Sequence, residues 1–206
     1  MPQTREITTV DELRDVVGHP NERAAGKVRD RLDDLHRAWL ARSPFHLVAT
    51  TGADGSMDVS PKGDPAGAVH VIDDRTIALP DRPGNRRVDG FENILQNPRV
   101  GLIFLVPRRG DTLRVNGRAR LLVDAPYAEA MEVKGHRPTI VTEVAVDEVF
   151  FHCSKAFLRS DLWDPEAWPA DDLPTQAQIA KAASPDTPMA ELQQHYDPEH
   201  YRSLMY

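Results

Sequence analysis

The sequence predicts a mainly β domain, an antiparallel barrel, with helical segments before and after it. Short segments that favour strands follow one another at hairpin spacing between about residues 44 and 152, which is the pattern of antiparallel barrels. Helical patterns are concentrated toward the two ends of the chain, so strands and helices do not alternate as they do around a parallel sheet. A chain of 206 residues has room for one such domain with extensions.

Residues 1–43 are expected to form a helical N-terminal extension. Thr9 is suited to cap a short helix over 11–17, which has acidic residues in its first turn. Farther along, apolar residues recur at intervals of four, three and four, as on one face of a helix. These residues are Val28, Leu32, Leu35 and Trp39. We expect this stripe to pack against the β domain.

Residues 44–165 are expected to form the β domain. An Asp-Gly pair at 54–55 and an Asp pair at 73–74 predict hairpin turns. The segment 99–106 is almost wholly apolar after its first residue, which predicts burial on both faces. A short helix is predicted over 89–95. The predicted strands are 45–50, 57–60, 68–72, 76–79, 99–106, 112–121, 141–146 and 149–152.

Residues 166–206 are expected to form a helical C-terminal tail. A further helical fragment, 153–160, precedes it, and the tail itself is polar and broken by prolines. Tyr196 and Tyr201 favour short helices that bury some apolar surface over a disordered end. We expect these helices to lie on the barrel or on a neighbouring subunit.

Composition argues against several classes of partner. The formal net charge of −7 does not suit a nucleic-acid partner, because binding to a duplex depends on neutralising phosphates with Lys and Arg. No apolar run approaches the ~18 residues of a membrane span, and no apolar stretch that resembles a secretory signal follows the first residues. We therefore expect a soluble, cytoplasmic protein.

The sequence predicts no metal site. Cys153 is the single cysteine, which excludes an internal disulfide and a site with several Cys ligands. We expect it to be a small buried apolar residue. His46, His70 and His152 fall in predicted strands without ligand partners at useful spacing, so we interpret them as structural. The glycine-rich motifs of Rossmann and P-loop nucleotide sites are missing too.

The loop that follows the strand 76–79 is the strongest candidate for a binding site. It reads Leu-Pro-Asp-Arg-Pro-Gly-Asn-Arg-Arg over 79–87 and leads into the helix 89–95. Three arginines in such a loop are unusual in an acidic chain, and guanidinium groups match phosphate oxygens in pairs. A loop before a helix start is also a suitable place for a phosphate. The alternative is that Asp81 and Asp89 simply neutralise exposed arginines.

Four motifs occur in the order found in one known family. They are Ser60-Pro61-Lys62-Gly63, the loop 79–87, Asn93-Ile94-Leu95-Gln96-Asn97-Pro98 and Leu113-Arg114-Val115-Asn116-Gly117. Over about 45–123 the sequence resembles the pyridoxamine 5′-phosphate oxidase-like, FMN-binding split-barrel proteins. The segment 150–163 is similar to the C-terminal signature of one branch of that family. The resemblance implies a six-stranded split β-barrel and a homodimer with one FMN at each end of the subunit interface.

The resemblance also implies which residues hold the cofactor. Lys62, Arg86 and Arg87 correspond to the basic groups around the FMN phosphate, and Asn85 lies in the same loop. Ser60 and Pro61 lie where backbone lines the flavin. Thr112 aligns near the ring, and Lys155, Arg159 and Trp163 lie where the partner subunit covers the flavin. The strand end whose backbone faces the isoalloxazine comprises Leu79, Pro80, Asp81 and Arg82.

The function that the resemblance implies is flavin-mediated oxidation or reduction of a small molecule. Pyridoxamine 5′-phosphate itself does not fit well as the substrate, since nothing like the Arg-x-His motif of true pyridoxamine phosphate oxidases follows the last predicted strand. No catalytic residue can be singled out. The alternative is a non-catalytic module of the same fold that holds FMN, haem or a deazaflavin; a deazaflavin enzyme is a further possibility.

Overall fold

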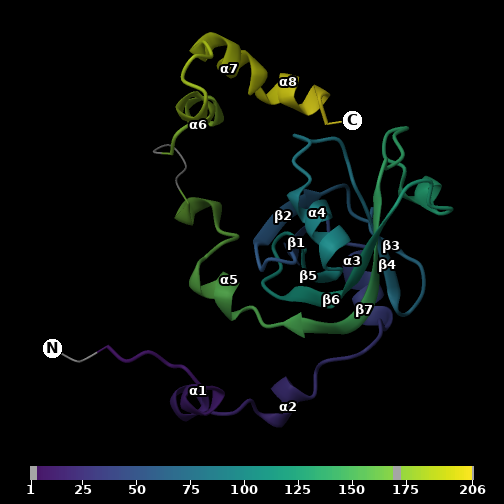
Figure 1. Cartoon of the computed structure of the whole chain (residues 1–206), viewed down its shortest axis with the longest axis vertical. Helices are drawn as coiled ribbons and strands as arrows, with labels where there is room; N and C mark the ends of the chain where they lie inside the picture. Colours follow the sequence, from purple (N-terminus) through teal and green to yellow (C-terminus); the bar gives the residue numbers. More distant parts are fainter. Residues whose placement is uncertain (1–3, 169–172, 206) are drawn as a thin grey trace.

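The structure is a computed structural model that describes residues 4–168 and 173–205. Small parts of the expected helical extensions, namely 1–3, 169–172 and 206, lie outside the described residues. All the strands belong to one sheet, and every pair of neighbouring strands is antiparallel. Their order is β2-β1-β5-β6-β7-β4-β3. The expected mainly β fold with flanking helices is therefore confirmed (Figure 1).

The sheet has seven strands where the family resemblance implied six. The shortest of them, β3, contains two residues and pairs with β4. The strands are β1 (Phe45–Thr51), β2 (Met57–Gly63), β3 (His70–Val71), β4 (Thr76–Pro80), β5 (Arg99–Leu105), β6 (Thr112–Leu122) and β7 (Val141–His152).

The two strands predicted at 141–146 and 149–152 are one continuous strand, β7. Its register against β6 shifts by one residue, since Asn116 pairs with Glu148 while Gly117 pairs with Val146. The extra residue, Asp147, is accommodated as a β-bulge, which bends a strand and increases its twist. A polar residue in the middle of the segment therefore bends the strand without ending it.

The sheet curls so that its two ends approach each other. β2 and β4 are the first and the sixth strand of the order, yet Lys62 Nζ lies 2.8 Å from Asp81 Oδ1, just past the end of β4. Helix α4 (Asp89–Gln96), at the predicted position, packs against β1, β2 and β6. This arrangement places the loop between β4 and α4 opposite the β1–β2 hairpin.

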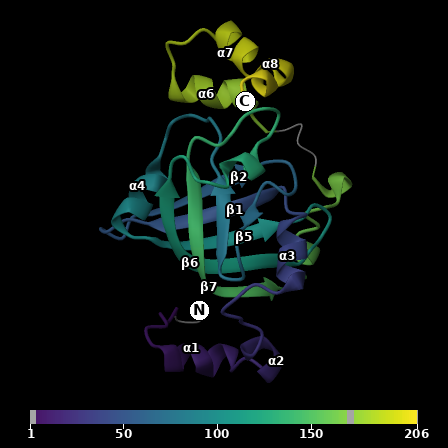
Figure 2. The ribbon, with the colours of Figure 1, turned by 90° about the vertical axis from the view of Figure 1, so that its right-hand side faces the viewer.

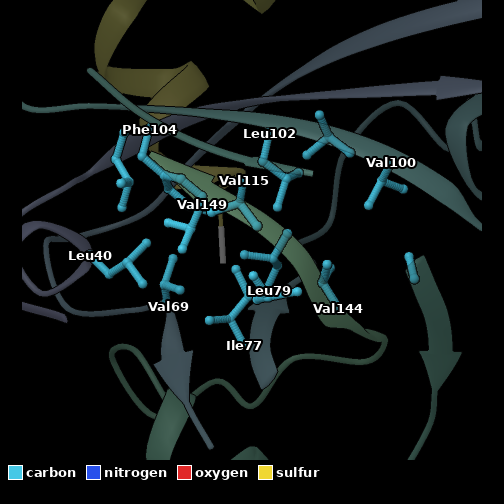
Figure 3. Close-up of a cluster of buried hydrophobic side chains, with 14 of the residues drawn as sticks. Leu40, Val69, Ile77, Leu79, Val100, Leu102, Phe104, Val115, Val144 and Val149 are labelled. Atoms are coloured by element: carbon cyan, nitrogen blue, oxygen red, sulfur yellow. The ribbon is translucent and has the colours of Figure 1, made fainter. Parts of the chain in front are cut away.

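The core lies inside this curve (Figure 3). Side chains from α3 (Asp34–Leu40) and from β4, β5, β6 and β7 converge there, among them Leu40, Ile77, Phe104, Val115 and Val149. Burial along β5 alternates: one side of the strand is buried and the other is half-buried. The prediction that 99–106 is buried on both faces is therefore wrong, because the second face is only partly covered by the residues that the structure describes.

The N-terminal extension is helical only in part. Helix α1 (Val10–Val17) begins as predicted, with Thr9 and Glu12 forming a reciprocal capping box, and it is followed by the short α2 (Glu22–Ala25). The apolar stripe is not one helix. Asp33 caps α3, and residues 28–33 before it are not helical, with Arg29 bridged to Val149 of β7. Local capping and pairing with β7 override the helical spacing.

The members of the stripe consequently separate. Leu32 and Trp39 are buried, whereas Leu35 is 70% exposed and Val28 is 40% exposed. Only half of the stripe packs against the β domain as expected.

The C-terminal tail forms short helices, as predicted. Helix α5 (Lys155–Arg159) follows β7 and is succeeded by a 3-10 turn, Pro165–Ala167. Helices α6 (Gln176–Ala183), α7 (Met189–His195) and α8 (Pro198–Ser203) then cluster beyond one end of the sheet, while α1 and α2 lie beyond the opposite end (Figures 1 and 2). Cys153 is exposed, contrary to expectation, because it lies just past the end of β7. No helix within the described residues is both long and apolar enough to cross a bilayer.

Candidate functional site

A cleft of about 670 Å³ lies between the β1–β2 hairpin and the loop that connects β4 to α4. A smaller cavity of about 40 Å³ adjoins it and reaches toward the core, where Leu79, Phe91 and Ile94 form its walls. Both cavities are lined by Ser60, Lys62 and Asp81. The approach of the two ends of the sheet therefore creates a site with one wall from each end.

The wall formed by the hairpin follows from strand register. His46 pairs with Lys62, and Val48 pairs with Ser60, in the antiparallel ladder of β1 and β2. Residues that pair directly present their side chains on the same face, and every second residue shares that face. The alternation of the two strands thus delivers imidazole, ammonium and hydroxyl groups to one surface.

Lys62 is held at the centre of the site. Its ammonium lies 2.8 Å from Asp81 Oδ1 and 5.1 Å from the centroid of the Phe91 ring. The Lys62 side chain is 32% exposed, so it can still contact a ligand. The charged contact and the ring together fix the position of the cation.

Arg87 supplies a second cation. Its backbone N–H donates to Asn85 Oδ1 over 2.9 Å, and its Nε donates to Asp89 Oδ2 over 2.9 Å. Arg87 lines both cavities. Arg86 lines neither of these two cavities and has a left-handed backbone conformation with a φ of 61°. The structure therefore brings together Lys62 and Arg87, but not Arg86.

Arg82, the third arginine of the loop, connects the loop to other parts of the fold. The Nε of Arg82 donates to Asp64 Oδ2 over 2.7 Å, and its other nitrogens donate to the carbonyl oxygens of Met131 and His136. Its side chain is 11% exposed. Arg82 lines the cleft, but its guanidinium is already committed to these three acceptors.

The N-terminus of α4 lies at the edge of the site. Val88 and Gly90 line the smaller cavity, and Asp89 lines the cleft. A β-carbon on Gly90 would lie 3.1 Å from Asp58 Oδ2, so glycine allows the polar side chains of β2 to approach the helix. Asp58 in turn accepts a hydrogen bond of 2.7 Å from Ser60.

Several residues of the site were missed by the sequence reasoning, among them Asp58, His46 and Tyr201. His46 was interpreted as structural, although its strand alternation places it on the face of Val48 and Ser60; that alternation is the signal that could have identified it. Tyr201 of α8 also lines the cleft. No local pattern in the sequence connects a C-terminal helix with the β1–β2 hairpin, so Tyr201 could not have been predicted.

His46 is buried against the core. Its relative exposure is 6%, and its ring centroid lies 5.0 Å from that of Phe104. Burial, with a smaller effect of the Lys62 charge, lowers the pKa of His46 to about 4. The imidazole is therefore neutral at pH 7.

The remaining predicted site residues form a second group at another place. Trp163 Nε1 donates to the carbonyl oxygen of Arg109 over 2.7 Å, and its ring stacks on Phe157 at 5.8 Å. Thr112 is buried and pairs with His152, near the start of α5. This second group comprises Thr112, Lys155, Arg159 and Trp163. None of its residues lines either cavity of its own chain.

Most of the predicted cofactor residues do lie together. Leu79 lines the smaller cavity. The cleft is lined by Ser60, Pro61, Lys62, Pro80, Asp81, Arg82, Asn85 and Arg87. Across residues 4–168 and 173–205, no three His, Cys, Asp or Glu side chains are grouped so that they could hold a metal ion.

Several solved structures are similar to parts of this chain. HupZ from Group A Streptococcus is 22% identical, with 58% of this chain and 93% of HupZ covered and a TM-score of 0.46. A candidate pyridoxamine 5′-phosphate oxidase from Lactobacillus delbrueckii is 24% identical, with coverage of 60% and 98% and a TM-score of 0.47. An FMN-binding protein from Syntrophomonas wolfei is 11% identical, with coverage of 58% and 89% and a TM-score of 0.42. With identities of 24% or less and TM-scores of 0.47 or less, these similarities do not indicate a function.

The comparison with protein families is more decisive. No curated protein matches the chain, but the family model described as pyridoxamine 5′-phosphate oxidase matches residues 32–153. The matched segment begins one residue before Asp33, which caps α3, and ends just after β7. It therefore contains both walls of the cleft. Because it spans more than half of the sequence, this chain belongs to the pyridoxamine 5′-phosphate oxidase family.

Proposed function

We propose that this chain binds FMN in the cleft and acts as a flavin-dependent oxidoreductase on a small molecule. One observation carries the proposal: Lys62 and Arg87, from opposite walls, line the same cleft of about 670 Å³. That volume lies within the range of sites for small molecules and cofactors. Family membership supports a flavin as the occupant.

The cations suit the phosphate end of FMN. Ammonium and guanidinium groups form charge-assisted hydrogen bonds to phosphate oxygens, and the adjacent N-terminus of α4 favours an anion. Lys62 is now paired with Asp81 and Arg87 with Asp89. A bound phosphate would share these cations with the two carboxylates, since a lysine or arginine can donate more than one hydrogen bond.

The carboxylates of the cleft suit the uncharged part of the ligand. Asp58, Asp81 and Asp89 are acceptors, and the ribityl chain of FMN offers hydroxyl donors. Leu79 and Pro80 present a buried strand end that can lie against the ring. The residues present thus fit an anion, a polyol and an apolar ring in one cleft.

Bound FMN would supply reversible electron transfer through its isoalloxazine ring. The contribution of the chain is to bind the phosphate, orient the ring and limit its access to water. The proposal includes the split barrel expected from the family, with the flavin held in the cleft where the two ends of the curled sheet approach each other. A small molecule would approach the exposed face of the ring, and pyridoxamine 5′-phosphate is not the expected substrate.

The proposal includes a homodimer, in which the partner subunit completes the site. Lys155 and Arg159 are exposed, Trp163 is 39% exposed, and none of the three lines the cleft of its own chain. An exposed segment with cations and an aromatic ring is suited to cover the flavin of a second copy. A stable FMN-loaded monomer in sedimentation at micromolar concentration would contradict this part of the proposal.

The absorption spectrum of the purified protein tests the cofactor. Protein loaded with FMN should show bands near ~375 and ~450 nm that disappear on reduction with dithionite. Bleaching by NAD(P)H as well would support an oxidoreductase, whereas bleaching by dithionite alone would favour a non-catalytic holder. A protein that is colourless and takes up no FMN on titration, or that instead shows a haem or deazaflavin spectrum, would overturn the assignment.

A further inference from the structure

One polar atom beside the cleft has no partner. His46 Nε2 is fully shielded and makes no hydrogen bond to any residue that the structure describes. Buried polar groups in folded proteins nearly always have a partner, because an unsatisfied one loses its hydrogen bonds to water without replacement. His46 is therefore an exception that calls for an explanation.

Packing alone does not explain a histidine at this position. The ring stacks on Phe104 at 5.0 Å, a contact that phenylalanine would make as well without a polar atom. Val48, the next residue on the same face of β1, is apolar and buried. A purely structural role would thus favour an apolar side chain in the place of His46.

The location of His46 offers a better explanation. It lies directly opposite Lys62 in the β1–β2 ladder, and both residues line the cleft. A ligand that contacts Lys62 therefore lies beside the imidazole. A neutral imidazole can donate through one ring nitrogen or accept through the other, so it suits a phosphate oxygen, a hydroxyl or a ring carbonyl of such a ligand.

We propose that His46 is a binding residue whose unpartnered nitrogen forms a hydrogen bond with the flavin in the cleft. This inference rests on the proposed function. Because His46 Nε2 is shielded in the structure without ligand, the imidazole turns toward the cleft when the ligand binds. The unpartnered nitrogen destabilises the folded chain without ligand, and the hydrogen bond to the flavin offsets that free energy in the complex. His46 therefore contributes to ligand specificity and lowers the stability of the unliganded protein.

Replacement by phenylalanine separates this role from a structural one. His46→Phe should keep the stacking on Phe104 and remove the unpartnered nitrogen, so the melting temperature without ligand should stay the same or rise. Its affinity for FMN should fall about tenfold, the usual effect of one lost hydrogen bond to a ligand. His46→Gln, whose side-chain amide can replace Nε2, should recover most of that loss.

His36 provides a matched control. It is also buried, at 4% exposure, and its ring stacks on an aromatic neighbour, Phe151, at 5.1 Å. Its Nδ1, however, accepts a hydrogen bond from the backbone N–H of Asp33 over 3.1 Å, and His36 does not line the cleft. His36→Phe should therefore lower the melting temperature and leave the affinity for FMN unchanged.

The experiment is a titration of the wild type and the three variants with FMN and with riboflavin, each followed by melting. A loss in His46→Phe for FMN alone assigns the bond to the phosphate, and an equal loss for both ligands assigns it to the ring or the ribityl chain. Wild-type affinity in His46→Phe overturns the inference and leaves the proposed function intact. A wild type that binds neither ligand overturns both.

A second measurement does not depend on how the variants fold. The imidazole signals of His46 in the NMR spectrum of the wild type should shift when FMN saturates the protein, while those of His36 should not. Unchanged His46 signals at saturation would also overturn the inference.

Discussion

Arg82 donates to Asp64 over 2.7 Å in a pair whose side chains are only 11% and 8% exposed. The same guanidinium donates to the carbonyl oxygens of Met131, over 2.6 Å, and His136, over 3.0 Å. One buried side chain therefore ties the loop after β4 both to the end of β2 and to the segment before β7. The shape of the cleft depends on this connection.

Arg82→Met should destabilise the protein strongly. It would leave the Asp64 carboxylate buried without its guanidinium, and breaking a buried pair in this way costs about 3–5 kcal/mol. Urea unfolding measures the loss. The matched control is Arg118→Met, which removes an ion pair whose side chains are 60% and 36% exposed and should cost less than about 1 kcal/mol. Equal losses of unfolding free energy in the two variants would show that the buried contacts of Arg82 do not hold the loop in place.

Gly117 should not tolerate a side chain. A β-carbon there would overlap the carbonyl oxygen of Ala145 at the bulge between β6 and β7, and backbone atoms cannot yield as a flexible side chain can. Gly117→Ala should therefore lower the melting temperature by about 5–10 °C, as expected for a strained core substitution.

Gly101 on the neighbouring strand provides the comparison. A β-carbon at Gly101 would lie 3.6 Å from Asn116 Oδ1 and 3.9 Å from the β-carbon of Ala49, which are ordinary contacts. Gly101→Ala should melt close to the wild type. A small effect of Gly117→Ala would mean that the bulge can relax around the added methyl group.

Sequence reasoning succeeded where local chemistry decides the structure. Thr9 forms the expected cap, because capping depends on residues only three positions apart. Most of the strands were found because alternation along a strand is a local pattern. The pairs His46–Lys62 and Val48–Ser60 follow from one hairpin, so the hairpin wall of the cleft was within reach of the sequence.

Prediction from the sequence failed where segments that are distant in the chain contact each other. The role of Arg82 depends on the carbonyls of Met131 and His136, about fifty residues away in the chain. The non-helical segment before α3 depends on pairing of Arg29 with Val149 of β7. Tertiary contacts override local helical spacing in such places, and a single sequence does not show them.

The stability of the protein should fall in mildly acidic solution, partly because of His46. Its pKa is about 4 in the folded state, against an ordinary value of 6.5, because of burial and then the Lys62 charge. Between these values the unfolded chain binds a proton that the folded chain does not, so unfolding becomes easier as the pH falls. His36, whose pKa is also lowered by burial, contributes with the same sign.

Urea unfolding at pH 7 and pH 5 measures this effect. The His46 contribution to the loss of stability between these pH values is about 2 kcal/mol. His46→Phe should lose correspondingly less stability than the wild type over the same interval, since protonation of carboxylates affects both proteins alike. If the two proteins lose the same amount, His46 is not held neutral by burial.

The phosphate assignment predicts a difference between neighbouring arginines. Arg87 lines the cleft beside Lys62, whereas Arg86 lines neither cavity, although the family resemblance implicates both. Lys62→Met and Arg87→Met should each weaken FMN binding by about ten- to a hundredfold, because each removes a charge-assisted contact worth about 1.5–3 kcal/mol. Riboflavin, which has no phosphate, should bind to these variants nearly as it does to the wild type.

Arg86→Met is the control for the loss of one positive charge from the same loop. It should change FMN affinity by no more than about threefold, the effect expected of a distant, screened charge. Isothermal titration of FMN and riboflavin against the three variants measures all of these differences. An Arg86 variant that loses as much FMN affinity as the Arg87 variant would show that the loop turns to bring both guanidinium groups onto the phosphate. Equal losses for FMN and riboflavin in the Lys62 and Arg87 variants would instead place the phosphate elsewhere in the cleft.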